Sequence, residues 1–323
     1  MRERVVGVAR VNADLLSLAV LLAVLIGAYQ HYDPSLFTPA SVTILSAQFL
    51  PLILAAAGQT TVMLLGGIDL SLGAVLGLAM AVFATYDAQG AAGVVTAAVL
   101  ALTVAAAAGA VNGTLVAYAG LPPIVVTLAA SFLWAGVTLV VLPQPGGEVP
   151  GGLVNAYNNG WYGIALPAVV IVVAVLAWKL LRTTRPGLAL YAVGGNEHGA
   201  YASGLHTRGV KISGYALAGV FTGLAGIGLA IQTGSADPTI GSPYTLNSIA
   251  ASVLGGISFF GGVGRMRGTV LGALVIGLLT NLLLFTGISP FYQLILQGVI
   301  LVVALALKTY LTTRTDLTSE ADA

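Results

Sequence analysis

Asp69 is the residue whose type and position most suggest chemistry, because it is the only acidic residue close to the interior of a long apolar stretch. An isolated charge inside a membrane is costly, so such a residue is functional by default and could carry a proton. Its segment, GGIDLSLG (Gly66–Gly73), also supports a structural interpretation. Asp69 and Ser71 can cap the helix that follows and satisfy backbone N–H groups that lipid cannot. We favour the structural role, in which Asp69 can still help to shape a cavity.

Neutral polar residues inside the apolar stretches form a second set of candidates. Each can hydrogen-bond to a neighbouring helix, which typically contributes less than ~1–2 kcal/mol. Alternatively, some of them line a pathway for a neutral, hydroxyl-rich solute. With Asp69 and Ser71, the residues predicted to line such a pathway are Gln59, Thr60, Asn112, Thr127, Asn281 and Gln293. The remaining members of this polar set are Gln48, Thr61, Ser131 and Gln297.

The sequence does not predict catalysis or a metal site. His31, His198 and His206 fall in loops without metal-ligand spacing, and the chain has no cysteine. No nucleophile is paired with a base, and the phosphate-binding pattern GxxxxGKS/T does not occur. We therefore expect a chain that is not an enzyme and holds no cofactor. Any ATP-driven work would need ATP and Mg²⁺ on a separate subunit.

The composition places these residues in a membrane. Hydrophobic residues make up 58% of the chain and charged residues 7%, whereas about 25% of the residues in soluble domains are charged. A chain of 323 residues can form about ten spans of ~20 residues in a single domain. The predicted fold is an all-α integral membrane protein that includes broken or half-depth segments. The predicted spans are Leu15–Tyr29, Val42–Leu65, Leu70–Thr85, Ala91–Tyr118, Ile124–Leu142, Ile164–Leu181, Ile212–Thr233, Leu246–Gly256, Thr269–Phe285 and Phe291–Lys308.

The positions of the charged residues give the spans an orientation. No small-residue cleavage site follows the first apolar run, so we interpret it as an uncleaved span. When ten spans are threaded from a cytoplasmic N-terminus, every Lys and Arg falls on the cytoplasmic side, as the positive-inside rule requires. The outer loops then carry only Asp33, Asp87, Glu148 and Asp237. We predict a cytoplasmic N-terminal segment (1–14), a cytoplasmic loop (182–211) and a cytoplasmic tail (309–323).

Two double-glycine segments resemble each other and mark breaks between spans. They read LLGGIDLSLG (Leu64–Gly73) and VLGGISFFGG (Val253–Gly262). Glycine-interrupted segments in corresponding halves of a transporter point to its pathway, although glycine-rich chains also match by chance. The span before the second break is too short to cross the bilayer, which favours a re-entrant segment. Arg265 and Arg267 follow it and can anchor at the inner interface or contact a partner subunit.

The longest polar interruption, Thr183–Ser213, contains a short predicted helix. Asn196 can cap its first turn, Glu197 adds negative charge near the positive end of the helix dipole, and Gly204 can end it in the left-handed conformation. About two turns of helix are marginal alone in water. The segment is therefore either a solvated connection or a surface that another protein holds.

The chain resembles the membrane permease subunit of bacterial ABC importers of the ribose/xylose/arabinose/galactose type. The motifs that carry the resemblance are GGIDLSLG (Gly66–Gly73), NGTLVAYAGLPPIVVTL (Asn112–Leu128), RPGLALYAVGGNEHGAYASGL (Arg185–Leu205), GSADPTIGSPYTLNSIAASVLGGISFFGGVG (Gly234–Gly264) and GISPFYQLILQGVILVVAL (Gly287–Leu305). They recur in order over nearly all of the chain past the first span.

The resemblance implies partners and a mechanism. It implies a location in the bacterial inner membrane, a second copy of the permease, a cytoplasmic ATP-binding subunit and a periplasmic sugar-binding protein, with no nucleic acid involved. It also implies that 182–211 is a coupling loop whose short helix docks on the ATPase. That role falls on Gly195, Asn196, Glu197, Ala200, Ser203 and Gly204. The loop departs from relatives at His198, Gly199 and Tyr201, and Gly199 is expected to weaken the helix by up to ~1 kcal/mol relative to Ala.

Several alternatives stay open at this point. Asp69 could serve a proton-coupled secondary transporter, and a passive channel would need neither ATPase nor binding protein. The solute could be a pentose, a hexose, a nucleoside or a furanose-like signalling molecule, because the family's specificity lies mostly in the binding protein. We also leave open whether the partner permease is identical to this chain.

Overall fold

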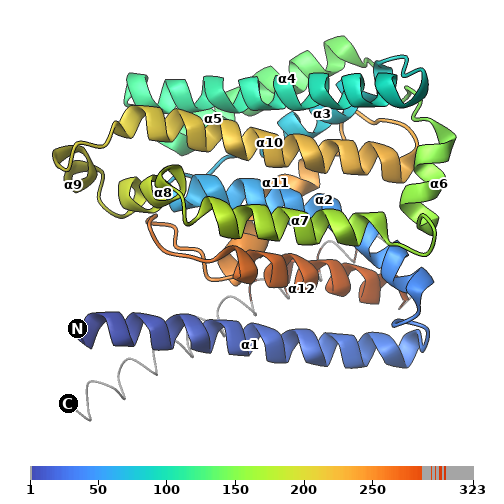
Figure 1. The fold of residues 1–323 in the computed structure, drawn as a ribbon, viewed down its shortest axis with the longest axis horizontal. Helices are drawn as coiled ribbons and strands as arrows, with labels where there is room; N and C mark the ends of the chain where they lie inside the picture. Colours follow the sequence, from blue (N-terminus) through green and yellow to red (C-terminus); the bar gives the residue numbers. More distant parts are fainter. Residues whose placement is uncertain (1, 286–291, 293–294, 296–297, 300–301, 303–323) are drawn as a thin grey trace.

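The chain folds into a bundle of helices that mostly run side by side in the computed structural model (Figure 1). The structure describes residues 2–285, 292, 295, 298, 299 and 302, and it describes side chains from residue 16 onward. The helices are α1 (Arg2–Tyr32), α2 (Pro39–Leu64), α3 (Leu72–Thr85), α4 (Gly90–Ala119), α5 (Pro123–Val141), α6 (Gly151–Asn159), α7 (Leu166–Leu181), α8 (Arg185–Gly195), α9 (Glu197–Ala202), α10 (Thr207–Thr233), α11 (Ser242–Leu254) and α12 (Met266–Phe285). No β-strand occurs among these residues, so the all-α prediction is confirmed for them.

The helix lengths agree with a chain that crosses a membrane several times. α2, α4, α5, α10 and α12 are each long and apolar enough to span, and α7 and α8 together would form a sixth span bent by 76°. The predicted short span Leu246–Gly256 corresponds to α11, with 13 residues. The predicted span Leu70–Thr85, which follows the first double-glycine break, corresponds to α3 and is also short, with 14 residues. The predicted span Phe291–Lys308 lies largely outside the described residues, so a total of ten spans stays a prediction.

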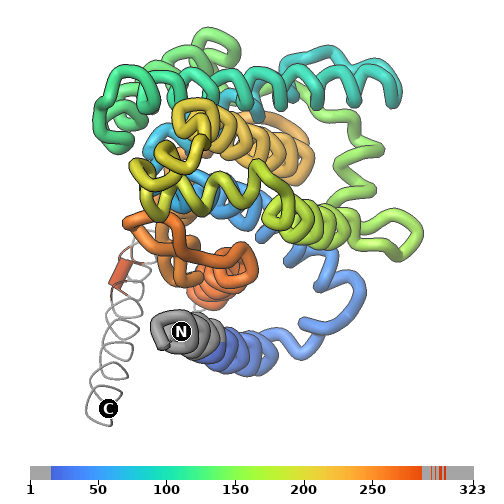
Figure 2. The backbone as a smooth tube through the Cα atoms, turned by 60° about the vertical axis from the view of Figure 1, so that its left-hand side comes forward, coloured from blue at the N-terminus to red at the C-terminus, as the bar shows by residue number. Residues whose placement is uncertain are grey.

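α2 is the central helix of the bundle. Every residue from Phe49 to Leu65 is buried, because α7, α10, α11 and α12 all pack against α2. In the most apolar part of α2, 67% of residues are buried, against 22% in α5. α5 therefore presents most of its surface outward, and α1 lies at the edge of the bundle against α12 (Figure 2).

Small residues let α4 and α10 approach until their backbones touch. Ala97, Ala101 and Ala105 recur every fourth residue on α4, and all three are fully buried. The series continues with Gly109, where an added Cβ would lie 2.2 Å from the carbonyl oxygen of Tyr215. Likewise, a Cβ added at Gly219 on α10 would lie 2.2 Å from the carbonyl oxygen of Ala105. Such small-residue stripes are how helices associate in lipid, where the hydrophobic effect between helices is weak.

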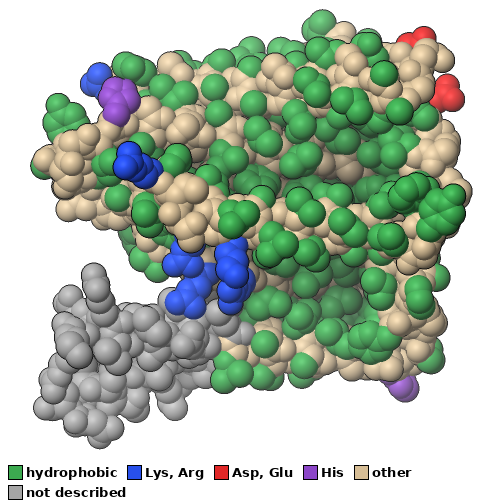
Figure 3. All heavy atoms as spheres, viewed as in Figure 1, with side chains coloured by type: hydrophobic (Ala, Val, Ile, Leu, Met, Phe, Trp, Pro, Cys, Tyr) green, Lys and Arg blue, Asp and Glu red, His purple; other side chains and the backbone are tan. Residues whose placement is uncertain are grey.

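Charged side chains are divided between the two ends of the bundle. On the face shown in Figure 3, the Lys and Arg side chains gather toward the end that carries α8 and α9, and the visible acidic side chains lie at the opposite end. Apolar side chains cover most of the surface between the two ends. This pattern is what a membrane protein needs, since only its ends meet water.

The close α4–α10 contact predicts that Gly219→Val destabilises the protein. The new side chain must push the two backbones apart, and overpacking of this kind costs about 1–3 kcal/mol. Gly136→Val on α5 is the matched control, because an added Cβ at Gly136 meets nothing within 4 Å. Thermal unfolding of both detergent-solubilised variants measures the difference. Equal loss of stability in the two variants would contradict the proposed packing role.

Candidate functional site

The α2 helix ends at a compact break beside Tyr215. The N–H groups of Leu65, Gly66 and Gly67 bond back to carbonyls of the last turn of α2. Gly66 has φ +78°, a left-handed conformation that favours glycine. At Gly67 a Cβ would lie only 2.7 Å from the Tyr215 hydroxyl, so a side chain does not fit there. Glycine is thus required at Gly66 by the left-handed backbone conformation and at Gly67 by the lack of space for a side chain.

Asp69 holds the backbone that follows the break, although it does not cap α3 as predicted. Its Oδ1 accepts hydrogen bonds from the Ser71 N–H at 2.8 Å and the Ser71 hydroxyl at 2.6 Å. Ser71 occupies the N-cap position of α3 but makes no side-chain bond to the first turn. The predicted helix cap is therefore wrong, because neither side chain bonds to the first turn of α3, but Asp69 does satisfy a backbone N–H group, that of Ser71.

Side chains of α2, α5 and α11 satisfy further backbone groups of the break. Thr127 Oγ1 of α5 accepts from the Leu70 N–H at 3.0 Å, and Thr245 Oγ1 of α11 accepts from the Gly73 N–H at 3.0 Å. With its amide oriented to match its neighbours, Gln59 of α2 donates to the Asp69 carbonyl (3.1 Å) and accepts from the Asp69 N–H (3.2 Å). The side chains of three helices thus replace the missing helical hydrogen bonds.

The same network reaches α4 and α5. Asn112 Nδ2 donates to Ser71 Oγ at 2.7 Å, and Trp134 Nε1 donates to Asn112 Oδ1 at 3.2 Å. We call Gln59, Asp69, Ser71, Asn112 and Thr127 the break network. All five are predicted pathway residues, and the structure brings them together. They are buried and hydrogen-bonded to one another or to the break, so in this conformation they do not line an open pathway.

The other predicted pathway residues lie elsewhere. Thr60 forms a separate buried cluster, with its hydroxyl 2.7 Å from that of Thr269 and 3.1 Å from that of Ser252. This cluster ties α2 to α11 and α12. Asn281 is paired with Gln48 near one end of the bundle, where its Nδ2 donates to Gln48 Oε1 at 2.8 Å. Gln293 lies outside the described residues.

The two double-glycine segments that resemble each other in sequence also meet in space. The Gly262 N–H donates to the Leu64 carbonyl at 2.9 Å. A Cβ at Gly261 would lie 2.8 Å from the Gly66 nitrogen and 2.5 Å from the Gly194 carbonyl oxygen. We call Gly66, Gly194, Gly261 and Gly262 the glycine junction. It joins both breaks to the end of α8, immediately before α9.

The predicted coupling helix is present as α9, with its expected ends. Asn196 Oδ1 accepts from the Gly199 N–H at 2.8 Å, which is the predicted N-cap. At the other end Gly204 has φ +86°, and the N–H groups of Gly204 and Leu205 bond back to Tyr201 and Ala200. This pair of hydrogen bonds is a Schellman motif. Gly199 has a further role, because an added Cβ would lie 3.1 Å from Asn196 Cγ and crowd the cap.

One side of α9 is anchored to the bundle and the other is free. Ala200 is buried in an apolar cluster with Leu65, Val193 and Tyr215. Glu197 pairs with Lys211 of α10 at 2.7 Å, a contact between residues 14 apart that sequence spacing did not suggest. Tyr201 points away from the bundle, with 72% of its surface exposed. An exposed aromatic on a short, fixed helix is typical of a protein docking surface.

Gly195 and Ser203 lie just before and just after α9, and their contacts are with the protein itself. Gly195 lies against the glycine junction, with Gly262 Cα 3.8 Å from the position of an added Cβ. The Ser203 hydroxyl donates back to the Gly199 carbonyl at 2.9 Å. In the described part of the chain, no group of three or more His, Cys, Asp or Glu side chains could hold a metal ion.

Comparisons with known proteins agree with a transport permease. Residues 41–305 match the family model described as the branched-chain amino acid transport system permease component. The chain is 39% identical to the ribose import permease protein of Bacillus subtilis, over 85% of this chain and 86% of that protein. It is 38% identical to the ribose import permease protein of Escherichia coli K12 (88% and 90%) and 33% identical to the D-allose transport system permease protein of the same strain (89% and 89%). No solved structure matches the chain.

The family model covers more than half of the chain, and these relatives align over most of their own length. The chain therefore belongs to this permease family, among the permease subunits of bacterial ABC sugar importers, and is a multi-pass protein of the inner membrane.

Proposed function

We propose that this chain is the transmembrane subunit of an ATP-driven importer that carries a monosaccharide, a pentose or a hexose, into the cytoplasm by alternating access. The observation that carries the proposal is α9, a capped helix with an exposed aromatic at the basic end of a permease whose relatives import ribose and allose. A cytoplasmic ATP-binding subunit, with its own ATP and Mg²⁺, docks there. A second copy of the permease completes the pathway, and a periplasmic binding protein delivers the sugar.

The proposed orientation places α9 and both termini in the cytoplasm, with ten spans in a single domain. Lys and Arg are retained on the cytoplasmic side of membrane proteins, and the described cations gather toward the α8–α9 end (Figure 3). Asp87 and Glu148 belong to loops at the opposite end, where the Glu148 N–H bonds to the Ala84 carbonyl at the end of α3. That end faces the periplasm.

A displacement of α9 can reach the broken spans through direct contacts. Ala200 packs with Leu65 at the end of α2. Gly194, two residues before Asn196, approaches Leu64 so closely that a Cβ would lie 1.7 Å from the Leu64 carbonyl oxygen. A movement imposed by the ATPase would therefore press on the glycine junction and the break network. Packed backbone contacts of this kind favour discrete alternative arrangements over gradual deformation.

Loss of the exposed aromatic of α9 is expected to weaken ATPase docking. Buried Tyr side chains at the centre of interfaces commonly contribute ~2 kcal/mol or more, about 30-fold in affinity. Tyr201→Ala should lower the affinity of the permease for the ATP-binding subunit by about this factor and reduce sugar uptake. Tyr162→Ala is the matched control, since Tyr162 is 88% exposed on a different loop. Binding of the ATPase to both variants in nanodiscs measures the effect, and unchanged affinity in Tyr201→Ala would argue against docking at α9.

Replacement of Asp69 separates ATP-driven transport from proton coupling. Asn at this position keeps an acceptor for the two bonds from Ser71, so Asp69→Asn should retain ATP-driven uptake within about 10-fold of wild type. Asp69→Leu, which removes the acceptor and leaves buried donors unpaired, should lose considerably more. The measurement is sugar uptake into proteoliposomes energised either with ATP or with a pH gradient. Uptake that the pH gradient drives and Asp69→Asn abolishes would instead identify a proton-coupled carrier.

A further inference from the structure

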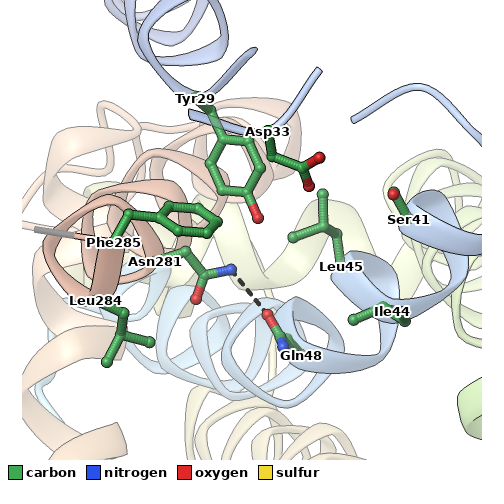
Figure 4. Close-up of a pocket in the computed structure, with 9 residues that line it drawn as sticks. All are labelled: Tyr29, Asp33, Ser41, Ile44, Leu45, Gln48, Asn281, Leu284 and Phe285. Carbon is green, nitrogen blue, oxygen red and sulfur yellow. Dashed lines mark hydrogen bonds between the residues drawn. The ribbon is translucent and has the colours of Figure 1, made fainter. Parts of the chain in front are cut away.

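A pocket with a largely apolar lining and a few polar groups lies between α1, α2 and α12, at the end of the bundle opposite α9. Its volume is about 260 Å³. Tyr29 and Asp33 come from the end of α1 and the residue after it, Gln48 from α2, and Asn281 and Phe285 from the end of α12 (Figure 4). Under the proposed orientation this pocket opens toward the periplasm, where a delivered solute would first meet the permease.

The pocket presents hydrogen-bonding groups that are only partly paired with other described residues. Gln48 and Asn281 share one hydrogen bond of 2.8 Å, between one N–H and one carbonyl oxygen. Each amide has two donor hydrogens and two acceptor lone pairs. Asn281 also interacts with the Tyr29 hydroxyl, and among the described residues the pair keeps further donors and acceptors for a ligand. The Tyr29 hydroxyl points toward the same pair, and the Asp33 carboxylate lies on the other side of Tyr29 (Figure 4).

Aromatic rings form an apolar wall beside these groups. The rings of Tyr29 and Phe285 meet edge to face, with centroids 5.1 Å apart. Phe285 also stacks on Tyr32 with a centroid distance of 6.1 Å. A sugar ring has the complementary chemistry, because its C–H groups pack against apolar surface while its hydroxyls donate and accept hydrogen bonds around the rim.

The amide pair differs from the polar contacts that only join helices. In the Thr60 cluster all three hydroxyls are buried and bonded to protein groups. The Gln48–Asn281 pair has the same sequence signal, a polar residue inside an apolar helix, but it is exposed to the pocket. The pair therefore presents amide groups to the pocket as well as joining α2 to α12.

Charge and size restrict the ligand. Among the described residues that line the pocket there is no Lys or Arg, and Asp33 supplies a carboxylate, so an anionic solute is disfavoured. The volume equals that of roughly nine water molecules in the liquid at ~30 Å³ each. It is slightly smaller than the ~300–1,000 Å³ of sites for drug-sized ligands. A neutral ligand with several hydroxyl groups fits both limits.

We propose that this pocket is an outer binding site for a neutral monosaccharide, with Gln48 and Asn281 as the hydroxyl-binding amides and Phe285 as the ring platform. This inference rests on the proposed function for its choice of solute. It adds that the permease itself selects for hydroxyl-rich cargo after the binding protein has released it.

Photoaffinity labelling of the full-length permease in nanodiscs tests this site directly. The probes are diazirine derivatives of ribose and of allose, and the labelled peptides are mapped by mass spectrometry. We expect labelling within residues 29–48 or 281–285, and excess unmodified sugar should reduce it at least 10-fold. Gln48→Leu/Asn281→Leu should abolish it. No competable label in these segments of the wild-type protein would overturn the proposal.

The matched control removes the same chemistry from another part of the chain. Asn155 and Asn159 of α6 form an exposed amide–amide hydrogen bond of 2.6 Å, and Asn155→Leu/Asn159→Leu should leave the labelling unchanged. Equal loss in both double variants would mean that the effect is unspecific and would reject the site.

Two further measurements complete the test. The first distinguishes a sugar site from a lipid site, and the second separates the proposed pocket from the proposed importer function. A lipid headgroup with a glycerol moiety has similar chemistry, so labelling is compared in nanodiscs with and without phosphatidylglycerol. Competition by that lipid but not by free sugar would reject the sugar site. ATP-driven uptake by the same protein with its ATPase and binding protein tests the proposed function separately. Labelling that persists without such uptake would reject the importer and retain the pocket.

Discussion

The need to satisfy backbone polar groups away from water determines how this bundle is assembled. A break in a helix leaves N–H and C=O groups that lipid cannot bond, so protein groups must replace the lost partners. At the α2–α3 break the replacements are the amide of Gln59 and the hydroxyls of Thr127 and Thr245. Because they belong to α2, α5 and α11, the break can exist only where these three helices meet. These polar contacts of the core are therefore consequences of one local irregularity.

Glycine residues bring the backbones on both sides of that irregularity into direct contact. Backbone-to-backbone contacts at Gly66, Gly194 and Gly261 leave no side chain between the two breaks and the end of α8. Close-packed interiors transmit displacement with little loss, because no soft side chains absorb it. The helix that follows, α9, is itself fixed at both ends by Asn196 and Gly204 and on its side by Lys211. These restraints fix α9 to the junction beneath it.

Polar residues inside the apolar helices serve two different purposes in the fold. Most of the predicted pathway residues are buried and hydrogen-bonded within the protein, and they hold helices in register. Asn281, with Gln48, instead faces a pocket of about 260 Å³ beside aromatic rings. In the sequence, the buried polar residues and those that face the pocket look alike, because each is a single polar residue in an apolar run. Whether such a residue meets another helix or an open space depends on packing, and hydrogen bonds of similar strength are available in both cases.

The amino-acid sequence by itself determined the class of protein, most helix positions and both ends of α9. These features depend on local composition and short spacing: apolar runs long enough for a bilayer, Asn before a helix and Gly after it. The sequence also indicated the two double-glycine breaks. Only the tertiary structure decided that the breaks touch, that Asp69 bonds to Ser71 without capping α3, and that Glu197 pairs with Lys211. The contact between the breaks and the Glu197–Lys211 pair join residues far apart in the chain, so they are set by how whole helices pack and no short window of sequence contains them. The Asp69–Ser71 contact is local, but residue types alone do not decide between this contact and a helix cap.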